Sequence, residues 1–352
     1  MGGMEKGIRG NARPAGRMIG FLKNEEIDRG QWDACLAEIP GLKPYSWSWY
    51  LDIMAPGWNA LVDDDYKSLF PLPCSRKFGF NYISTPVFLQ QLGLFSADGD
   101  RDSMASEFIS FMPEFYRLID LNIGQEVDPP GFTVLPRYNF ELKLNHPYES
   151  VWMNYTTDCR RNINIAHRYP QEIVSNVEPH EVISLFRNNI GKRAGIIRDT
   201  SYDRLHSLMD YCLKTDRGKI LGVRSPKGKI LWGIFMIETG NRITLLFTAG
   251  SRKSRELRTA YHVIDNIIKE RAGTGKTVDF AGSTVPSIAI FMKSFGGEKT
   301  VYYRLYRNTL PWPARLFKKS EKKLYHLVVR IRLRNLSVFA PHCSCRVLFY
   351  QR

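Results

Sequence analysis

The sequence predicts an α+β fold in which a mixed sheet is flanked by helices, and the order of elements in its C-terminal half carries this prediction. Three apolar segments come first, separated by turn residues such as Ser225-Pro226-Lys227-Gly228. A long basic amphipathic helix, a short strand, a second helix and a last strand follow. The predicted order is β-β-β-α-β-α-β, over residues 218–223, 230–238, 241–248, 254–271, 276–280, 286–295 and 300–306.

Within this order, residues 276–297 form a strand–turn–helix unit. Residues 276–280 include the β-branched or aromatic Thr277, Val278 and Phe280. Ala281-Gly282-Ser283 follow, which indicates a buried strand stopped by a turn. Pro286 suits a first helical turn, where its missing N–H costs nothing, and Gly296-Gly297 end the helix.

The N-terminal half fits a second copy of this architecture more weakly. Strands are predicted at residues 59–62, 68–74 and 81–84, a helix at 103–119, and one or two strands at 132–144. The helix prediction depends on apolar residues that recur on one side.

The order of elements, with a basic loop after the third strand, resembles the GCN5-related N-acetyltransferase (GNAT) fold. The pattern Asp279-Phe280-Ala281-Gly282, then eight residues, then Phe291-Met292-Lys293-Ser294-Phe295-Gly296 is similar to the DF-x-G and FK-x-x-FG signature of FemAB-like transferases, with Met292 inserted. Residues 152–168 resemble the segment that opens the second GNAT-like domain of that group, where paired basic residues precede a short amphipathic helix. Residues 45–58 and 90–93 resemble FemAB-like proteins of Bacteroidetes-type bacteria.

The resemblance implies two GNAT-like domains in tandem, for which 352 residues are enough. We expect an N-terminal domain at 18–150 and a C-terminal FemAB-like domain at 151–319. A basic flexible N-terminus (1–17) and a basic tail (320–352) carry most of the net charge of +15. The tail could be an amphipathic segment in peripheral contact with a membrane, an added strand, or an extension with no chemical role.

Cysteine and histidine spacing predicts neither a metal site nor a covalent nucleophile. The six cysteines are scattered without a C-x-x-C pair, and the seven histidines show no ligand-like or triad-like grouping. Because no stretch of about 18 apolar residues occurs and the basic start lacks an apolar segment behind it, we expect a cytoplasmic protein. We expect no DNA partner. Residues 272–277 end like a P-loop, but a helix precedes and a strand follows, so they are interpreted as a helix-to-strand connection.

Residues 250–258 are the candidate site for a donor phosphate. Acyl transfer from acyl-CoA needs a place for the pyrophosphate, and N–H groups at a helix start supply one. The GNAT glycine pattern R/Q-x-x-G-x-G/A is not present, since Ser254 and Glu256 stand where glycines would help. The alternative is a solvated basic first turn. The candidate residues are Gly250 and Ser251, which allow close approach of the backbone, and Arg252, Lys253, Arg255 and Arg258, which supply charge.

The GNAT resemblance places the donor thioester between the strands at 241–248 and 276–280. It therefore implies that Asp279 lies beside the reaction centre, where it would hold or deprotonate an acceptor ammonium; a turn-capping carboxylate is the alternative. Lys293 matches the family lysine, which implies contact with the donor or the oxyanion, and the alternative is a surface lysine.

Three further residues are candidates. Tyr303 would return a proton to the leaving group, and because the strand alternates with period two, only one face of its tyrosines can look into a cleft. Arg160 and Arg161 would bind an anionic acceptor, with an exposed basic helix face as the alternative.

The leading hypothesis is an N-acyltransferase that moves an acyl group from acyl-CoA, with acetyl-CoA as first choice, to an amine on a cell-envelope precursor or glycan. It would act by positioning and oxyanion stabilisation. The FemAB resemblance implies instead an aminoacyl-tRNA donor and a peptidoglycan-precursor acceptor. We find no long charged helical hairpin with heptads, which favours acyl-CoA over tRNA. A non-catalytic nucleotide- or glycan-binding protein is the third hypothesis.

Overall fold

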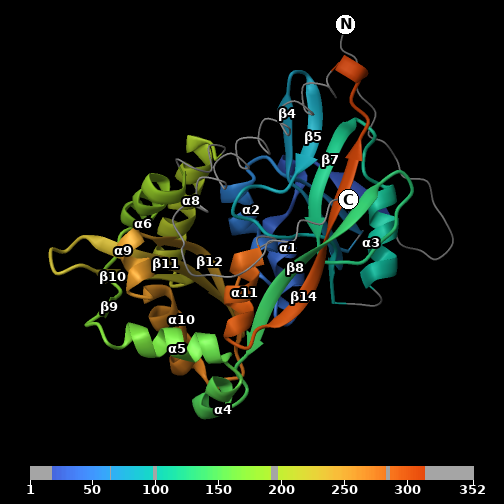
Figure 1. Ribbon diagram of the computed structural model, residues 1–352. Helices are drawn as coiled ribbons and strands as arrows, with labels where there is room; N and C mark the ends of the chain where they lie inside the picture. Colours follow the sequence, from blue (N-terminus) through green and yellow to red (C-terminus); the bar gives the residue numbers. More distant parts are fainter. Residues whose placement is uncertain (1–17, 64, 98–100, 192–196, 283–285, 314–352) are drawn as a thin grey trace, which may run out of the picture.

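The computed structural model describes residues 18–63, 65–97, 101–191, 197–282 and 286–313, and the strands within them form two sheets (Figure 1). The larger sheet has the strand order β4-β5-β7-β14-β8-β13-β12-β11-β10-β9. Its bounds are β4 Cys74–Lys77, β5 Phe80–Ser84, β7 Tyr116–Ile123, β8 Thr133–Lys143, β9 Ile173–Val174, β10 Gly218–Arg224, β11 Ile230–Thr239, β12 Arg242–Gly250, β13 Thr277–Asp279 and β14 Glu298–Asn308. The smaller sheet, β1-β2-β3-β6, consists of β1 Ile19–Leu22, β2 Asn59–Asp63, β3 Ser68–Leu72 and β6 Phe95–Ser96.

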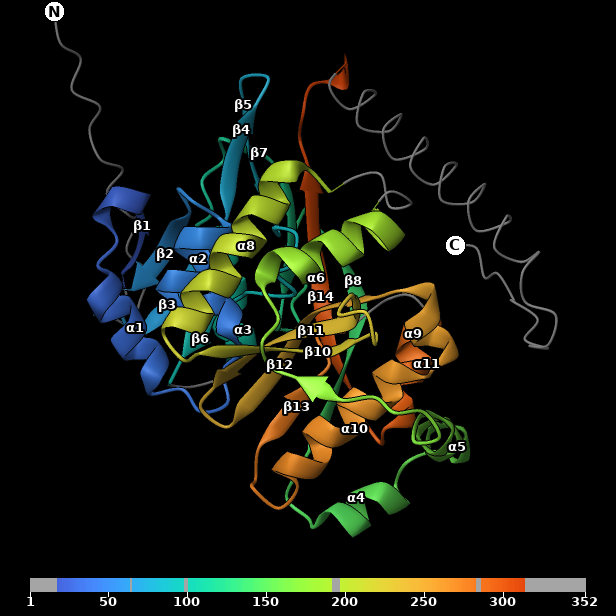
Figure 2. The same ribbon diagram turned by 90° about the vertical axis from the view of Figure 1, so that its left-hand side faces the viewer.

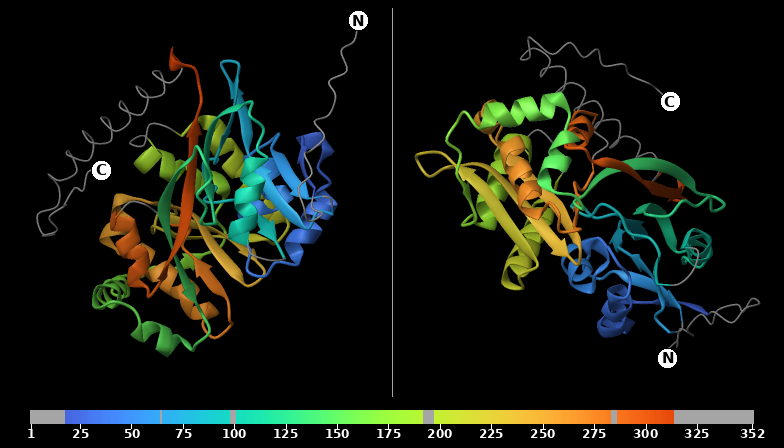
Figure 3. Two further views of the ribbon diagram at one scale, coloured as in Figure 1. Left: turned by 90° about the vertical axis from the view of Figure 1, so that its right-hand side faces the viewer. Right: turned by 90° about the horizontal axis from the view of Figure 1, so that it is seen from below.

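β14 lies between two strands of the N-terminal half. It pairs antiparallel with β7 on one side and with β8 on the other, and the long β8 and β14 run side by side (Figure 3). β8 also pairs antiparallel with β13, so strands from both halves form one continuous sheet. The domain limits 18–150 and 151–319 stay a prediction, and the pairing of β14 crosses them. The predicted terminal segments 1–17 and 320–352 lie outside the described residues.

Helices cover both faces of the C-terminal half of the large sheet (Figure 2). The segment of β11 that reads Trp232 to Ile237 is apolar at nearly every position because both its faces are buried. Trp232, Ile234 and Met236 belong to the core with α4, α5, α10 and α11, whereas Phe235 and Ile237 belong to the core with α6 and α8. The helices are α1 Arg29–Ala37, α2 Ser48–Met54, α3 Arg101–Ser110, α4 Tyr148–Met153, α5 Thr157–Ala166, α6 Pro179–Phe186, α8 Asp199–Lys214, α9 Arg252–Glu256, α10 Thr259–Arg271 and α11 Pro286–Ser294, with single turns η1 Asn24–Glu26, η2 Pro44–Ser46 and η3 Arg187–Gly191.

The predicted α+β class and the C-terminal order of elements are confirmed. The connection at residues 272–277 does join a helix, α10, to a strand, β13. One detail is wrong: the basic helix expected over 254–271 is two helices, α9 and α10. The chain breaks between them because Arg258 takes a left-handed φ of 59°, which no regular helix accommodates.

Two predictions in the N-terminal half are wrong. The helix expected at 103–119 ends at Ser110, because Pro113 cannot continue it, and residues 116–123 form β7. The strand expected at 68–74 is divided at Pro73 into β3 and β4, which belong to different sheets. Residues 81–84 therefore pair with β4 and β7 in the large sheet and not with β2.

Candidate functional site

The parallel strands β12 and β13 separate after three residue pairs, the last of which is Thr244 with Asp279. β13 ends at Asp279, whereas β12 continues to Gly250. The next N–H, that of Phe280, donates to the carbonyl of Phe140 on β8 at 3.1 Å. Because the chain stays with β8, the two parallel strands open beyond Asp279.

Asp279 lies where the strands separate, and its side chain is fully buried. Its Oδ2 pairs with the ammonium of Lys43 and with Nη1 of Arg242, the latter at 3.4 Å. Its Oδ1 accepts hydrogen bonds from Nδ2 of Asn139 and from the N–H of Ala281, both at 2.8 Å. Asp279 therefore caps the turn after β13 and also neutralises two cations.

A second carboxylate, Glu141 on β8, completes what we call the central charged cluster: Lys43, Glu141, Arg242 and Asp279. Glu141 pairs with Lys43 Nζ at 2.8 Å and with Arg242 Nη1 at 2.9 Å. Burial raises the pKa of Glu141, but the two cations lower it by more, so the net pKa lies below its ordinary value and the carboxylate is charged at neutral pH. The side chains of Lys43, Glu141 and Arg242 remain 15, 17 and 14% exposed, so solvent reaches the cluster from one side.

Two polar atoms without a hydrogen-bond partner adjoin the cluster within the described part of the chain. Nε2 of Gln90 and Oδ1 of Asn139 are both buried. Both face Gly282, since a Cβ added there would lie 2.6 Å from the first and 2.8 Å from the second. It would also lie 2.8 Å from the carbonyl oxygen of Tyr138, and Gly282 has a positive φ of 45°. Glycine at this position of the DF-x-G motif therefore leaves room next to an unpaired donor and an unpaired acceptor.

A hollow of about 210 Å³ adjoins the cluster through Lys43. The hydroxyl of Tyr45, which also lines the hollow, is buried without a hydrogen-bond partner among the described residues. Burial, followed by the charge of Asp279, raises the pKa of Tyr45, so its hydroxyl stays protonated. The hollow is thus suited to a small polar group. Its other polar side chains are Ser46, Gln91, Arg101 and Gln125.

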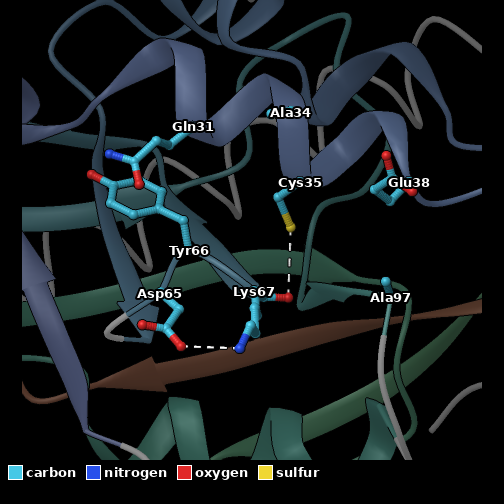
Figure 4. Close-up of a pocket in the computed structure, with 8 residues that line it drawn as sticks. All are labelled: Gln31, Ala34, Cys35, Glu38, Asp65, Tyr66, Lys67 and Ala97. Carbon is cyan, nitrogen blue, oxygen red and sulfur yellow. Dashed lines mark hydrogen bonds and ion pairs between the residues drawn. The ribbon is translucent and has the colours of Figure 1, made fainter.

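A larger hollow, of about 350 Å³, lies between α1 and the turn that joins β2 to β3 (Figure 4). There Sγ of Cys35 donates to the carbonyl of Lys67 at 3.5 Å, and Lys67 pairs with Asp65 at 3.0 Å. Its lining includes no member of the central charged cluster and no residue of the sequence motifs. We therefore place the candidate site at the smaller hollow, because Lys43 connects it directly to the DF-x-G motif.

Residues 250–258 form the expected connection from strand to helix. A Cβ on Gly250 would lie 2.8 Å from Cδ1 of Trp232, so a side chain here would clash. Ser251 caps α9 by accepting the N–H of Ser254 at 3.1 Å. The four cations, Arg252, Lys253, Arg255 and Arg258, are all exposed, and the first two pair with Glu256 at 3.4 and 3.5 Å.

The structure does not bring the other predicted catalytic residues into contact with the cluster. Lys293 is exposed on α11, and Tyr303 lies on β14 beside Glu126, which raises the pKa of its phenol by a hydrogen bond. Its neighbour Tyr302 is buried on the opposite face, where burial raises its pKa and the charge of Asp279 adds a smaller increase. Tyr302 is therefore the tyrosine of β14 that faces the cluster.

Arg160 and Arg161 both lie within α5, rather than before a helix. Arg160 is half-buried, and Arg161 is exposed and pairs with Asp158 one turn away at 2.8 Å. α5 packs on α10, so these arginines belong to the helical layer and not to the strands that separate at Asp279.

Sequence reasoning did not find Lys43, Glu141 or Arg242. Lys43 is 236 residues from Asp279, and no local pattern connects them. One signal in the sequence pointed to Arg242. A carboxylate at the end of a buried strand needs a cation, and Arg242 begins the neighbouring strand.

In the part of the chain that the structure describes, no three His, Cys, Asp or Glu side chains are grouped so that they could hold a metal ion. Nor does any helix of those residues have the length and apolar character needed to cross a membrane.

No family model matches the sequence, and the curated proteins offer no match either. Solved structures do resemble the chain. FemX matches with a TM-score of 0.57 and 14% identity, over 82% of this chain and 97% of that chain. A conserved protein of unknown function from Bacteroides thetaiotaomicron VPI-5482 matches with a TM-score of 0.49 and 11% identity, over 82% of this chain and 99% of that chain. L-PGS from Bacillus licheniformis matches with a TM-score of 0.46 and 13% identity, over 82% of this chain and 95% of that chain. At this identity the likeness shows the fold alone, and the match to FemX confirms the FemAB-like fold that the motifs predicted.

Proposed function

We propose that this protein is an acyltransferase that moves an acyl group from acyl-CoA directly to an amine. The observation that carries the proposal is the opening of β12 and β13 beyond Asp279, because the GNAT resemblance implies that the donor lies between these two strands. The FemAB-like fold and the charged cluster at this opening support it.

On the donor side, the thioester would lie at the opening and the pyrophosphate near residues 250–258. Arg252 and Lys253 would exchange Glu256 for phosphate oxygens, and Arg255 would add a further charge-assisted contact. These side chains are free to move because they are exposed.

On the acceptor side, the amine would enter through the hollow lined by Lys43. Its nitrogen attacks the acyl carbon, a C–N bond forms as the C–S bond breaks, and the proton lost from nitrogen finally reaches the departing thiolate. Glu141 is charged and partly exposed, so we propose that it holds the acceptor ammonium and receives its proton. Asp279, buried against two cations, would position Lys43 and Arg242, while Lys293 would stabilise the oxyanion. Tyr302, which faces the cluster, would replace the predicted Tyr303 as the group that protonates the thiolate.

Donor binding tests the proposal. Calorimetry with acetyl-CoA, a longer acyl-CoA and charged tRNA should show binding of an acyl-CoA, and the pair Arg252→Ala with Arg255→Ala should weaken it roughly 30-fold, or about 2 kcal/mol. The matched control is Lys214→Ala with Lys219→Ala, which removes the same charge from exposed residues of α8 and β10, outside residues 250–258, and should leave binding unchanged. An affinity that survives the loss of both arginines would remove residues 250–258 from the site.

Turnover of labelled acetyl-CoA with a panel of amines tests the catalytic roles. Glu141→Gln, Asp279→Asn and Lys293→Met should each lower kcat roughly a hundredfold, the size of one general-base or oxyanion contribution. Lys293→Met should leave the melting temperature unchanged because the residue is exposed. Binding of acyl-CoA without turnover on any amine would instead support the non-catalytic hypothesis.

A second candidate is transfer of an aminoacyl group from charged tRNA to a cell-envelope peptide precursor. The observation that favours it is the match to FemX over 97% of that chain, since the FemAB resemblance implies this donor. In the same calorimetry, binding of charged tRNA but of no acyl-CoA would decide for this candidate, and binding of neither would overturn both.

A further inference from the structure

The β4–β5 hairpin presents an aromatic residue at its tip. β4 and β5 pair antiparallel up to Lys77 with Phe80, which leaves Phe78 and Gly79 as a two-residue turn. Both turn residues have positive φ, 50° and 80°, as a type I′ turn requires. Phe78 is 86% exposed.

Folding does not account for a phenylalanine at this position. A bulky residue with positive φ is strained, and the type I′ turn prefers asparagine there. Burial does not compensate for the strain, because the ring lies in solvent. A strained, exposed aromatic side chain is a reason to look for a binding role.

A second exposed aromatic residue lies at the same end of the large sheet. Asn81 of β5 pairs with Tyr116 at the start of β7, and Leu118 of β7 pairs with Asn308 at the end of β14. Trp312 follows four residues later and is 73% exposed. Figures 1 and 2 show the β4–β5 hairpin and the turn after β14 projecting at one end of the molecule.

Cations accompany these rings. Arg76 and Lys77 are exposed, and Lys77 Nζ lies 5.2 Å from the centroid of the Phe78 ring. β4 is the outermost strand of its sheet, and charge on such a strand also prevents edge-to-edge pairing, but this does not explain Phe78.

We propose that the hairpin tip and Trp312 dock on an anionic lipid surface. Exposed Phe and Trp rings enter the bilayer interface, while neighbouring Arg and Lys contact anionic headgroups. RNA binding also uses aromatic and basic residues, but it uses grooves, whereas the exposed Phe78 and Trp312 belong to a hairpin tip and to the turn after β14. The inference is independent of the proposed acyl transfer.

Flotation of the full chain with vesicles of equal parts phosphatidylcholine and phosphatidylglycerol tests the proposal, with phosphatidylcholine alone as reference. We expect binding to the anionic vesicles, and a loss of at least about tenfold in partition for Phe78→Asn and for Trp312→Ala, the effect of withdrawing one large apolar side chain. Phe78→Asn should keep or raise the melting temperature because asparagine suits the turn, so the loss cannot be ascribed to unfolding.

Met153→Asn is the matched control, because Met153 is 70% exposed on α4 at the other end of the molecule, and it should leave partition unchanged. Equal partition of Phe78→Asn and the unaltered chain would overturn the proposal. The proposal would also be overturned if Phe78→Asn left vesicle partition unchanged but weakened the binding of single-stranded RNA, because the hairpin tip would then bind nucleic acid. Acyl-CoA affinity should not change in Phe78→Asn.

Discussion

Carboxylates are buried in two regions of this protein, and their electrostatic surroundings differ between the two. In the central charged cluster, Glu141 and Asp279 face Lys43 and Arg242 at the junction of β8, β12 and β13. In the helical layer, Asp265 of α10 is also buried, and its two carboxylate oxygens accept hydrogen bonds from the neutral hydroxyl of Tyr148, at 2.8 and 3.0 Å.

The pKa values of Glu141 and Asp265 shift in opposite directions. Burial raises the pKa of Asp265, and the nearby hydroxyls of Tyr148 and Tyr155, with the more distant charges of His167 and Lys269, only partly offset this. Burial acts in the same direction on Glu141, but two adjacent cations more than offset it. Burial alone therefore does not decide the direction in which the pKa of a carboxyl group shifts here; the presence of a cation in contact does. Of the two regions compared, the central cluster is the one in which carboxylates contact cations directly.

Removal of Lys43, the cation that Glu141 and Asp279 share, should have the largest effect on the free energy of unfolding. Lys43→Met leaves two buried carboxylates short of a cation, and we expect a loss of about 3–5 kcal/mol in the free energy of unfolding. Urea denaturation measures this loss. Lys67→Met is the control, because the exposed Lys67–Asp65 pair should contribute less than about 1 kcal/mol. Similar losses in both variants would show that burial of the cluster does not matter.

The cluster can also be disturbed from the backbone side. Gly282→Ala forces a Cβ against Gln90, Asn139 and the carbonyl of Tyr138 at a positive φ, and should cost roughly 3 kcal/mol. Gly240→Ala has the same kind of φ, 54°, but nothing within 4 Å, so it should cost only the backbone strain, roughly 1 kcal/mol. Thermal denaturation of the two variants separates crowding from strain, and equal costs would mean that the space beside Gly282 is not needed.

The smallest predicted effect is on the pH dependence of the free energy of unfolding. Because the folded-state pKa of Asp265 is raised above its ordinary 3.8, its contribution favours folding in acid and is lost as pH rises through the folded pKa. The lowered pKa of Glu141 gives the opposite sign: its contribution is present above the ordinary 4.5 and is lost as pH falls through the folded pKa.

The free energy of unfolding of Asp265→Asn should therefore rise relative to that of the unaltered chain as pH increases above 3.8. The free energy of unfolding of Glu141→Gln should rise relative to that of the unaltered chain as pH decreases below 4.5. Each difference should change by less than about 1.4 kcal/mol per pH unit, the limit for one proton. Urea midpoints measured across this range check both signs, and slopes of the same sign would refute the electrostatic contrast.

Local sequence patterns predicted most elements of the C-terminal half. Period, turn residues and the glycines around Asp279 predicted the strands and helices from β10 to β14, and the DF-x-G motif identified the turn at which the strands separate. These features depend on neighbours within a few residues, which a single sequence displays. In the N-terminal half, apolar residues around Pro113 are compatible with a helix or with a strand, and the pairing of β7 with β5 and β14 decided for the strand.

Which residues share the site depends on long-range packing. Lys43 contacts Asp279 across 236 positions, and β14 lies between β7 and β8, whose residues were expected in another domain. Tyr302 instead of Tyr303 faces the cluster because the register of β14 on β8 determines which side of the strand is buried. A buried charge is tolerated only where the folded chain supplies its partner, so the partner's identity is a property of long-range packing and cannot be read from the residues next to it.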